Sequence, residues 1–154
     1  MIGVLIISHE PLGTALLHCT RHIFGRLPPQ LAALDVVPDE DPDLALNSAR
    51  ELLARINDGS GVFVLTDLYG ATPGRIAGRL AEPGRVMVIA GVNLPLLVKA
   101  LTYRRGPLEE IGERLLQGVR DTIVAVEPPP HAEPPPHAEP PPHAEPPPPR
   151  AKPK

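Results

Sequence analysis

Cysteine is nearly absent from this chain of 154 residues, since Cys19 is the only one. No disulfide can therefore form within one chain, and a reducing compartment fits the composition. No apolar stretch approaches the ~20 residues that a membrane span requires. The N-terminus also lacks the positively charged region that opens a secretory signal peptide. We therefore expect a cytoplasmic protein without an integral membrane segment.

The sequence also lacks the motifs of several large classes of protein. Its net charge is only −3 and no run of lysine and arginine occurs, so we expect no nucleic-acid partner. The one basic pair, Arg104-Arg105, is typical of a solvated helix end. No nucleotide-binding glycine motif, nucleophile elbow or zinc-type Cys/His spacing is present, so we expect neither a cofactor nor a metal ion.

Proline is plentiful, but its distribution is uneven. Fourteen of the 28 residues from Glu127 onward are proline, and the unit Pro-Pro-Pro-His-Ala-Glu occurs three times between Pro128 and Glu145. Such a segment cannot bury enough apolar surface to offset the entropy of folding, which predicts a disordered or extended tail over residues 127–154. In a polyproline II helix successive histidines of the repeat stand ~19 Å apart, too far for one metal site. We interpret the tail as a stiff spacer or docking arm, or as a plain tail without a partner.

Residues 1–126 alternate between short apolar runs and amphipathic segments. This order predicts a single α/β domain, built on an open and mainly parallel sheet with helices on both faces. We expect strands over Ile2–Ile7, Leu31–Val37, Val62–Leu65, Arg85–Ala90 and Val119–Val126. We expect helices from Pro11 to Phe24, from Asp41-Pro42 to the Gly59-Ser60-Gly61 turn, from Pro73 to Leu80, from a cap at Asn93, and over Pro107–Gln117.

Polar segments follow three of the predicted strands. They are Ser8-His9-Glu10-Pro11, Thr66 to Pro73, and Gly91-Val92-Asn93. Because ligands bind at the carboxyl ends of parallel strands, we expect these segments to meet at one rim of the sheet.

His9 is the candidate nucleophile at this rim. The helix that begins near Pro11 should present unpaired backbone N–H groups, which suit a phosphate and disfavour a protonated imidazole. Asp67 can accept a hydrogen bond from one ring nitrogen, which leaves the other free to attack. Gly70 permits close backbone approach and Thr72 offers a hydroxyl. Each residue also has a plain structural interpretation, as a surface, capping or turn residue.

The three segments together resemble the mannose-type IIA proteins of the bacterial phosphoenolpyruvate-dependent sugar phosphotransferase system. The likeness covers residues 1–126 and lies in Ile6-Ile7-Ser8-His9, in the loop Thr66 to Pro73, and in Gly91-Val92-Asn93-Leu94-Pro95. It implies that His9 is phosphorylated, that Asp67 orients it and that Thr72 helps to bind the phosphoryl group. It also implies a phosphotransferase activity, the carrier protein HPr as donor, and a IIB domain as acceptor in transport systems. Proteins of the family are often homodimers that exchange a C-terminal strand, which would be Val119–Val126 in this chain.

The chain departs from the family pattern in three places, the first of which is the small change of the family's serine to Thr72. Ala71 stands where the family has a second glycine, and it would be strained if that position needs a positive φ. Nothing resembling a IIB domain follows the tail, which favours a regulatory phosphorelay. The alternatives are a transport IIA subunit with a separate IIB chain and a non-catalytic anion-binding module.

Overall fold

The computed structural model describes residues 1–129. The chain divides into a compact unit, Met1–Val124, and a second unit, Ala125–Lys154. The fold described below is that of the first unit. Of the predicted tail only residues 127–129 are described, and they have no regular secondary structure, so the expectations for the histidines of the repeats lie outside the described residues.

A four-stranded parallel sheet forms the centre of the first unit. Its strands lie in the order β2-β1-β3-β4, and every neighbouring pair is parallel. The predicted α/β class with an open sheet is confirmed. The strands are β1 (Gly3–His9), β2 (Leu31–Val36), β3 (Val62–Thr66) and β4 (Val86–Ala90).

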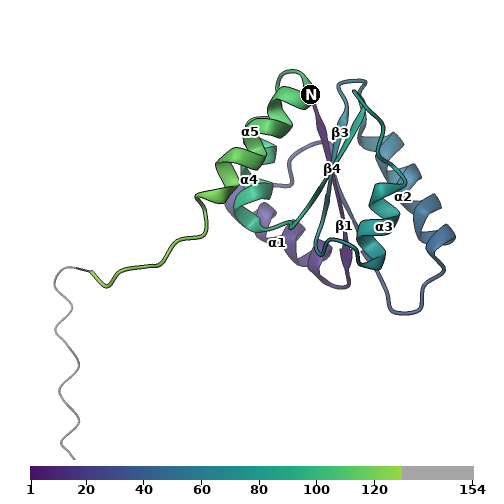
Figure 1. The fold of residues 1–154 in the computed structure, drawn as a ribbon, viewed down its shortest axis with the longest axis horizontal. Helices are drawn as coiled ribbons and strands as arrows, with labels where there is room; N and C mark the ends of the chain where they lie inside the picture. The colour runs from purple at the N-terminus through teal and green to yellow at the C-terminus, as the bar shows by residue number, and fades with distance from the viewer. Residues whose placement is uncertain (130–154) are drawn as a thin grey trace, which may run out of the picture. The chain divides into compact units, whose positions relative to one another are not determined.

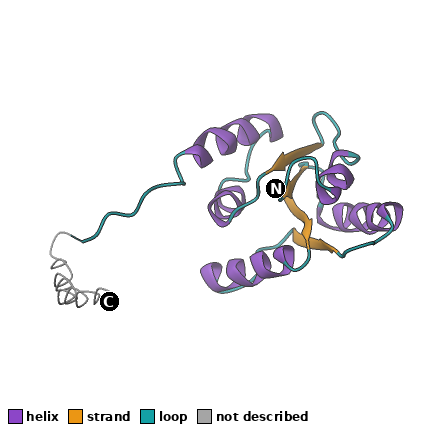
Figure 2. Cartoon of the chain, turned by 60° about the horizontal axis from the view of Figure 1, so that its bottom comes forward, coloured by secondary structure: helices purple, strands orange, loops and turns teal. Residues whose placement is uncertain are grey.

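Five helices cover the two faces of the sheet. Figure 1 shows α1, α4 and α5 on one side and α2 and α3 on the other, and Figure 2 shows the same layers from another direction. No helix in residues 1–129 combines the length and apolar character needed to cross a membrane. The helices are α1 (Leu12–Phe24), α2 (Pro42–Ile56), α3 (Thr72–Gly78), α4 (Leu94–Thr102) and α5 (Leu108–Arg120).

Local capping residues set several of these boundaries. Gly25 ends α1 in the left-handed conformation, with φ of 73°. The side chain of Asp41 accepts a hydrogen bond from the Asp43 amide at the start of α2. The side chain of Asn93 accepts one from the Leu96 amide over 2.9 Å, so the predicted cap of α4 is confirmed.

Strand β1 supplies both halves of the core. Val4 and Ile6 belong to the apolar cluster under α1, α4 and α5, whereas Leu5 and Ile7 belong to the cluster under α2 and α3. All four side chains are fully buried. A strand buried on both faces reads as a continuous apolar run, which is why this strand could be predicted from sequence.

The predicted C-terminal strand is wrong for the single chain. Val119 and Arg120 belong to α5, and residues 123–129 have no regular structure. Leu115 and Val119 stand four positions apart and pack on the same core cluster, so helical periodicity continues into the first residues of the segment that we expected to be extended. A strand also needs a neighbour for its backbone groups, and residues 123–129 pair with none of the four strands of the sheet. Exchange of this segment between two chains stays a prediction.

Candidate functional site

The site lies between β1 and β3, where the order in which the chain adds strands to the sheet reverses. After β1 the chain turns into α1 on one face, and after β3 it turns into α3 on the other face. Open parallel sheets bind ligands at such a switch point, outside the carboxyl ends of the strands. His9 is the last residue of β1, and Asp67 directly follows β3, so the two strands that flank the switch point deliver both residues.

Asp67 holds His9 by both backbone and ring. Its Oδ2 lies 2.9 Å from the His9 amide nitrogen and 2.7 Å from the ring Nδ1. The His9 side chain is 53% exposed, whereas that of Asp67 is 14% exposed. The contact therefore ties up Nδ1 and leaves Nε2 as the ring nitrogen that an incoming group can reach.

The carboxylate of Asp67 is kept ionised by its hydrogen bonds. Partial burial alone would raise its pKa, but the His9 amide, the His9 ring and the Leu68 amide donate to it and together lower the pKa below its ordinary value. The bond from Leu68 to Oδ1 is 2.8 Å long. Asp67 therefore fulfils both sequence interpretations, since it orders its own loop and contacts His9.

The loop between Asp67 and α3 turns sharply at Gly70. Its φ is 83°, a conformation that favours glycine. Ala71 has φ of −74° and ψ of 172°, which is ordinary extended backbone, so the strain that we considered for this residue is absent. Only the first of the two positions where the family pattern has glycine requires a positive φ here.

A cleft of about 460 Å³ opens beside the His9 ring, and Thr72 stands on its wall together with His9. The Thr72 hydroxyl accepts a long contact of 3.4 Å from Arg75 Nη2. Gly70 borders a neighbouring hollow that Tyr69 and Arg75 also line. The structure thus brings His9, Asp67 and Thr72 to one place, while Gly70 shapes the loop that connects them.

Segment Gly91-Val92-Asn93 supports the backbone of the site but contributes no side chain to the contact between His9 and Asp67. The Gly91 amide donates to the Asp67 carbonyl and the Val92 amide to the Thr66 carbonyl, each over 2.9 Å. Asn93 caps α4, as described above. The third polar segment of the rim therefore fixes the backbone on which Asp67 stands.

Asp35, which is not among the residues predicted for the site, occupies the start of α1. Its carboxylate accepts hydrogen bonds from the Gly13 amide at 2.8 Å, the Thr14 amide at 3.2 Å and the Thr14 hydroxyl at 2.5 Å. A Cβ on Gly13 would lie 2.6 Å from Asp35 Oδ1, so glycine at this position lets the carboxylate reach the helix.

The start of α1 is therefore no open anion site. We expected unpaired N–H groups there, and that prediction is wrong for Gly13 and Thr14 because Asp35 already satisfies them. The clue in the sequence was a lone carboxylate inside the apolar run Leu31–Val37. A charge in a strand with covered faces needs a partner, and the register places Asp35 beside Ser8, one residue before His9.

Comparisons with known proteins show which family and fold the chain resembles. The EIIA-man family model, described as "PTS system fructose IIA component", matches residues 3–115. The fructose-specific EIIA component of Bacillus subtilis is 32% identical over 105 residues, which cover 68% of this chain and 71% of that protein. The mannose-specific EIIAB component of Escherichia coli K12 is 30% identical over 104 residues, so the match spans 67% of this chain but only 32% of that relative's length. The mannose/sorbose-specific IIA subunit of Enterococcus faecalis shares the fold, with a TM-score of 0.72 at 20% identity over 83% of this chain and 96% of that one.

Proposed function

Because the chain belongs to the EIIA-man family of phosphotransferase-system components, we propose that it accepts a phosphoryl group on His9 and passes it to a protein partner. The observation that carries the proposal is the contact between Asp67 Oδ2 and His9 Nδ1 at 2.7 Å. This contact favours the tautomer in which Nδ1 bears the hydrogen. Nε2 then keeps its lone pair and is the nucleophile.

The transfer balances without any cofactor. The Nε2 lone pair of neutral His9 attacks the phosphorus of a donor phosphohistidine, and the donor's P–N bond breaks. The donor ring, protonated on its other nitrogen, leaves as neutral imidazole, and the His9 ring becomes a phosphorylated imidazolium with hydrogen on Nδ1. The Asp67 carboxylate stabilises this new positive charge directly through its bond to Nδ1. In this scheme Thr72, on the wall of the same cleft, donates its hydroxyl to the phosphoryl oxygens.

We propose HPr as the donor and another protein, a IIB domain or a regulatory target, as the acceptor. The exposure of the His9 ring supports this, because two phosphohistidine carriers must bring their rings into contact. Incubating the phosphorylated protein with a purified mannose-type IIB domain distinguishes between these two kinds of acceptor. Rapid loss of the label to IIB indicates transport, and retention of the label indicates a regulatory relay.

We propose a homodimer formed through the edge of the sheet. β4 is an end strand of the four-stranded sheet, so one row of its backbone groups lacks a strand partner. Beyond α5, Ile123 and Val124 are 86% and 70% exposed. A second chain could bury these apolar side chains by pairing the segment with β4. Light scattering of the full chain and of a chain ending at Thr122 tests this, and a dimer that survives the truncation contradicts the exchange.

The test of the function itself is phosphorylation with purified components. The protein is incubated with phosphoenolpyruvate, enzyme I and HPr, and its intact mass is measured. We expect one acid-labile phosphoryl group that His9→Ala abolishes and His18→Ala, a change of an exposed histidine on α1, leaves in place. Labelling of the His9→Ala protein would show that the phosphorylated residue is another one.

A further inference from the structure

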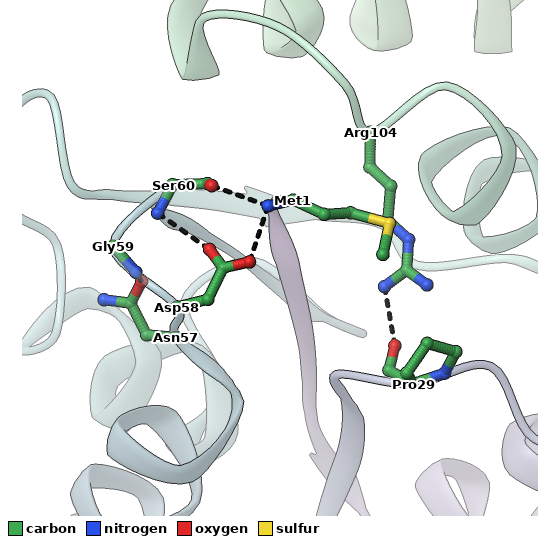
Figure 3. A network of polar contacts seen from close by, with 7 residues as sticks. All are labelled: Met1, Pro29, Asn57, Asp58, Gly59, Ser60 and Arg104. Atoms are coloured by element: carbon green, nitrogen blue, oxygen red, sulfur yellow. Dashed lines mark hydrogen bonds and ion pairs between the residues drawn. The ribbon is translucent and has the colours of Figure 1, made fainter.

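Arg104 lies near the end of the sheet opposite His9, just after α4. We expected the Arg104-Arg105 pair to be a solvated helix end, which is correct for Arg105 but wrong for Arg104. Arg104 is buried, with only 4% of the residue exposed. Figure 3 shows its guanidinium reaching past the Met1 side chain to the Pro29 carbonyl, to which Nη1 donates over 2.8 Å.

Within residues 1–129 this buried cation has no anionic partner at ion-pair distance. Nε has no hydrogen-bond partner at all, and the Pro29 carbonyl is the sole described acceptor of the group. Burial lowers the pKa of Arg104, and the charge of Asp58 opposes that effect only from a distance. Since a guanidinium does not lose its proton in proteins, the positive charge stays, and buried charges are normally paired.

The nearby carboxylate is already engaged. Asp58 Oδ2 accepts from the Met1 amino group at 2.6 Å, and Oδ1 accepts from the Ser60 amide at 3.0 Å (Figure 3). Asp58 is thus neutralised by another cation. The charge of Arg104 is left uncompensated, and exposed Arg105 adds to it.

A cleft of about 330 Å³ opens at this point, lined by Met1, Ile2, Ser60, Arg104, Arg105 and Gly106. The lining is rich in donors. The Ser60 hydroxyl oxygen accepts from the Met1 amine at 2.6 Å and lies on the wall of the cleft. Within residues 1–129 the amides of Arg105 and Gly106 donate to no protein acceptor.

We propose that this cleft is a second ligand site, which binds the phosphate group of a small phosphorylated metabolite. Its volume lies at the lower end of small-molecule pockets, ~300–1,000 Å³, and exceeds the ~30 Å³ of a water molecule many times, so there is room for an organic group beyond the phosphate. The seven residues of β1 separate the site from His9 by about 20 Å at ~3.3 Å per residue. The site is therefore distinct from the one proposed for phosphoryl transfer, and it does not depend on that function.

The experiment is a titration of the ¹⁵N-labelled full chain, followed by amide chemical shifts. The probes are inorganic phosphate and glycerol phosphate, with sodium chloride at equal ionic strength as the reference. We expect saturable shifts at Ser60, Arg105 and Gly106 with tighter binding of glycerol phosphate. Shifts that sodium chloride reproduces, or shifts confined to the loop around His9, would overturn the proposal.

Variants decide whether the lining residues hold the ligand. Arg105→Gln and Ser60→Ala should each weaken binding by about fivefold, the scale of one partly exposed polar interaction. Arg50→Gln, a change of an exposed arginine on α2, should leave binding unchanged. Arg104→Lys keeps the buried charge but loses the planar donor set, and it should weaken binding most, with folding checked by the same spectra. If all three cleft variants titrate like the unmodified chain, the proposal is refuted.

Discussion

Replacing Asp67 with asparagine tests the proposed mechanism most directly. Asparagine has nearly the same shape, but it offers one oxygen and one NH₂ group in place of two oxygens. Asp67 uses both oxygens, because Oδ2 accepts from His9 and Oδ1 accepts from the Leu68 amide. In either orientation of the amide, one of these donors faces the NH₂ group, and the negative charge opposite Nδ1 is lost.

The size of the effect follows from these contacts. The two hydrogen bonds to Oδ2 involve a charged acceptor, and such bonds contribute about 1.5–3 kcal/mol each. Only the bond to Nδ1 strengthens as the ring becomes an imidazolium, so the barrier should rise by a similar amount or somewhat more. Loss of an orienting or acid–base partner typically costs ~10²–10⁴-fold in rate, which corresponds to about 2.7–5.4 kcal/mol. The free energy of unfolding should fall by about 1.5–3 kcal/mol, the contribution of one hydrogen bond to a charged acceptor, because the asparagine oxygen can still accept from either His9 or Leu68.

The assay is single-turnover phosphorylation by phosphorylated HPr, with ¹⁵N shifts of the His9 ring recorded in parallel. We expect the rate to fall at least a hundredfold and the fraction of the Nδ1–H tautomer to fall with it. Asp43→Asn is the matched control, because it removes the same charge from an exposed ion pair with Arg79. An unchanged rate for Asp67→Asn would reduce Asp67 to a loop residue. An equal loss in both variants would show that general charge, and not the contact to Nδ1, matters.

Four further outcomes are expected. Gly70→Ala should lower the free energy of unfolding by about 1–2 kcal/mol in thermal denaturation, because φ is 83° although the space around the glycine is open. Asp35→Ala should lower the free energy of unfolding by about 0.5–2 kcal/mol, because the first amides of α1 lose their acceptor. An unchanged midpoint of thermal denaturation would contradict that role. Because the pKa of Asp67 is lowered in the folded state, its stabilising effect should be complete above its unfolded pKa of ~3.9 and fade as the pH falls through the lower folded value. When the free energy of unfolding is measured against pH, Asp67→Asn should lack the decrease that Asp67 causes in the acid range. A chain ending at Val126 should accept the phosphoryl group from HPr at a rate within about twofold of the full chain's rate, a difference of ~0.4 kcal/mol in the barrier. If the truncated chain stays folded and keeps its assembly but is no longer phosphorylated, the tail recruits HPr.

The sequence predicted the fold because its signals are local. β1 to β4 are apolar runs separated by amphipathic helices, and turn and cap residues such as Gly25, Asp41 and Asn93 mark the boundaries. The rule that parallel strands present ligands at their carboxyl ends then placed His9 and Asp67 on one rim, which the structure bears out. None of these inferences required a contact between distant residues to be known.

The C-terminal segment shows where local signals fail. Val119–Val126 has the composition of a strand, but a strand forms only where another strand can pair with it, and the end of α5 instead continues the packing of that helix. Composition describes a preference, whereas pairing depends on a neighbour that the sequence of this segment does not contain.

Only the tertiary structure decided which partners the charged groups have. The sequence by itself determined an α/β sheet with a histidine and a carboxylate at one rim. It could not show that Asp35 fills the start of α1, or that Arg104 is buried while Asp58 is held by the Met1 amino group. The physical reason is that periodicity fixes which face a residue shares with its near neighbours. The pairing of a buried charge depends instead on register and on crossings between segments far apart in the chain, here Gly13 with Asp35 and Pro29 with Arg104.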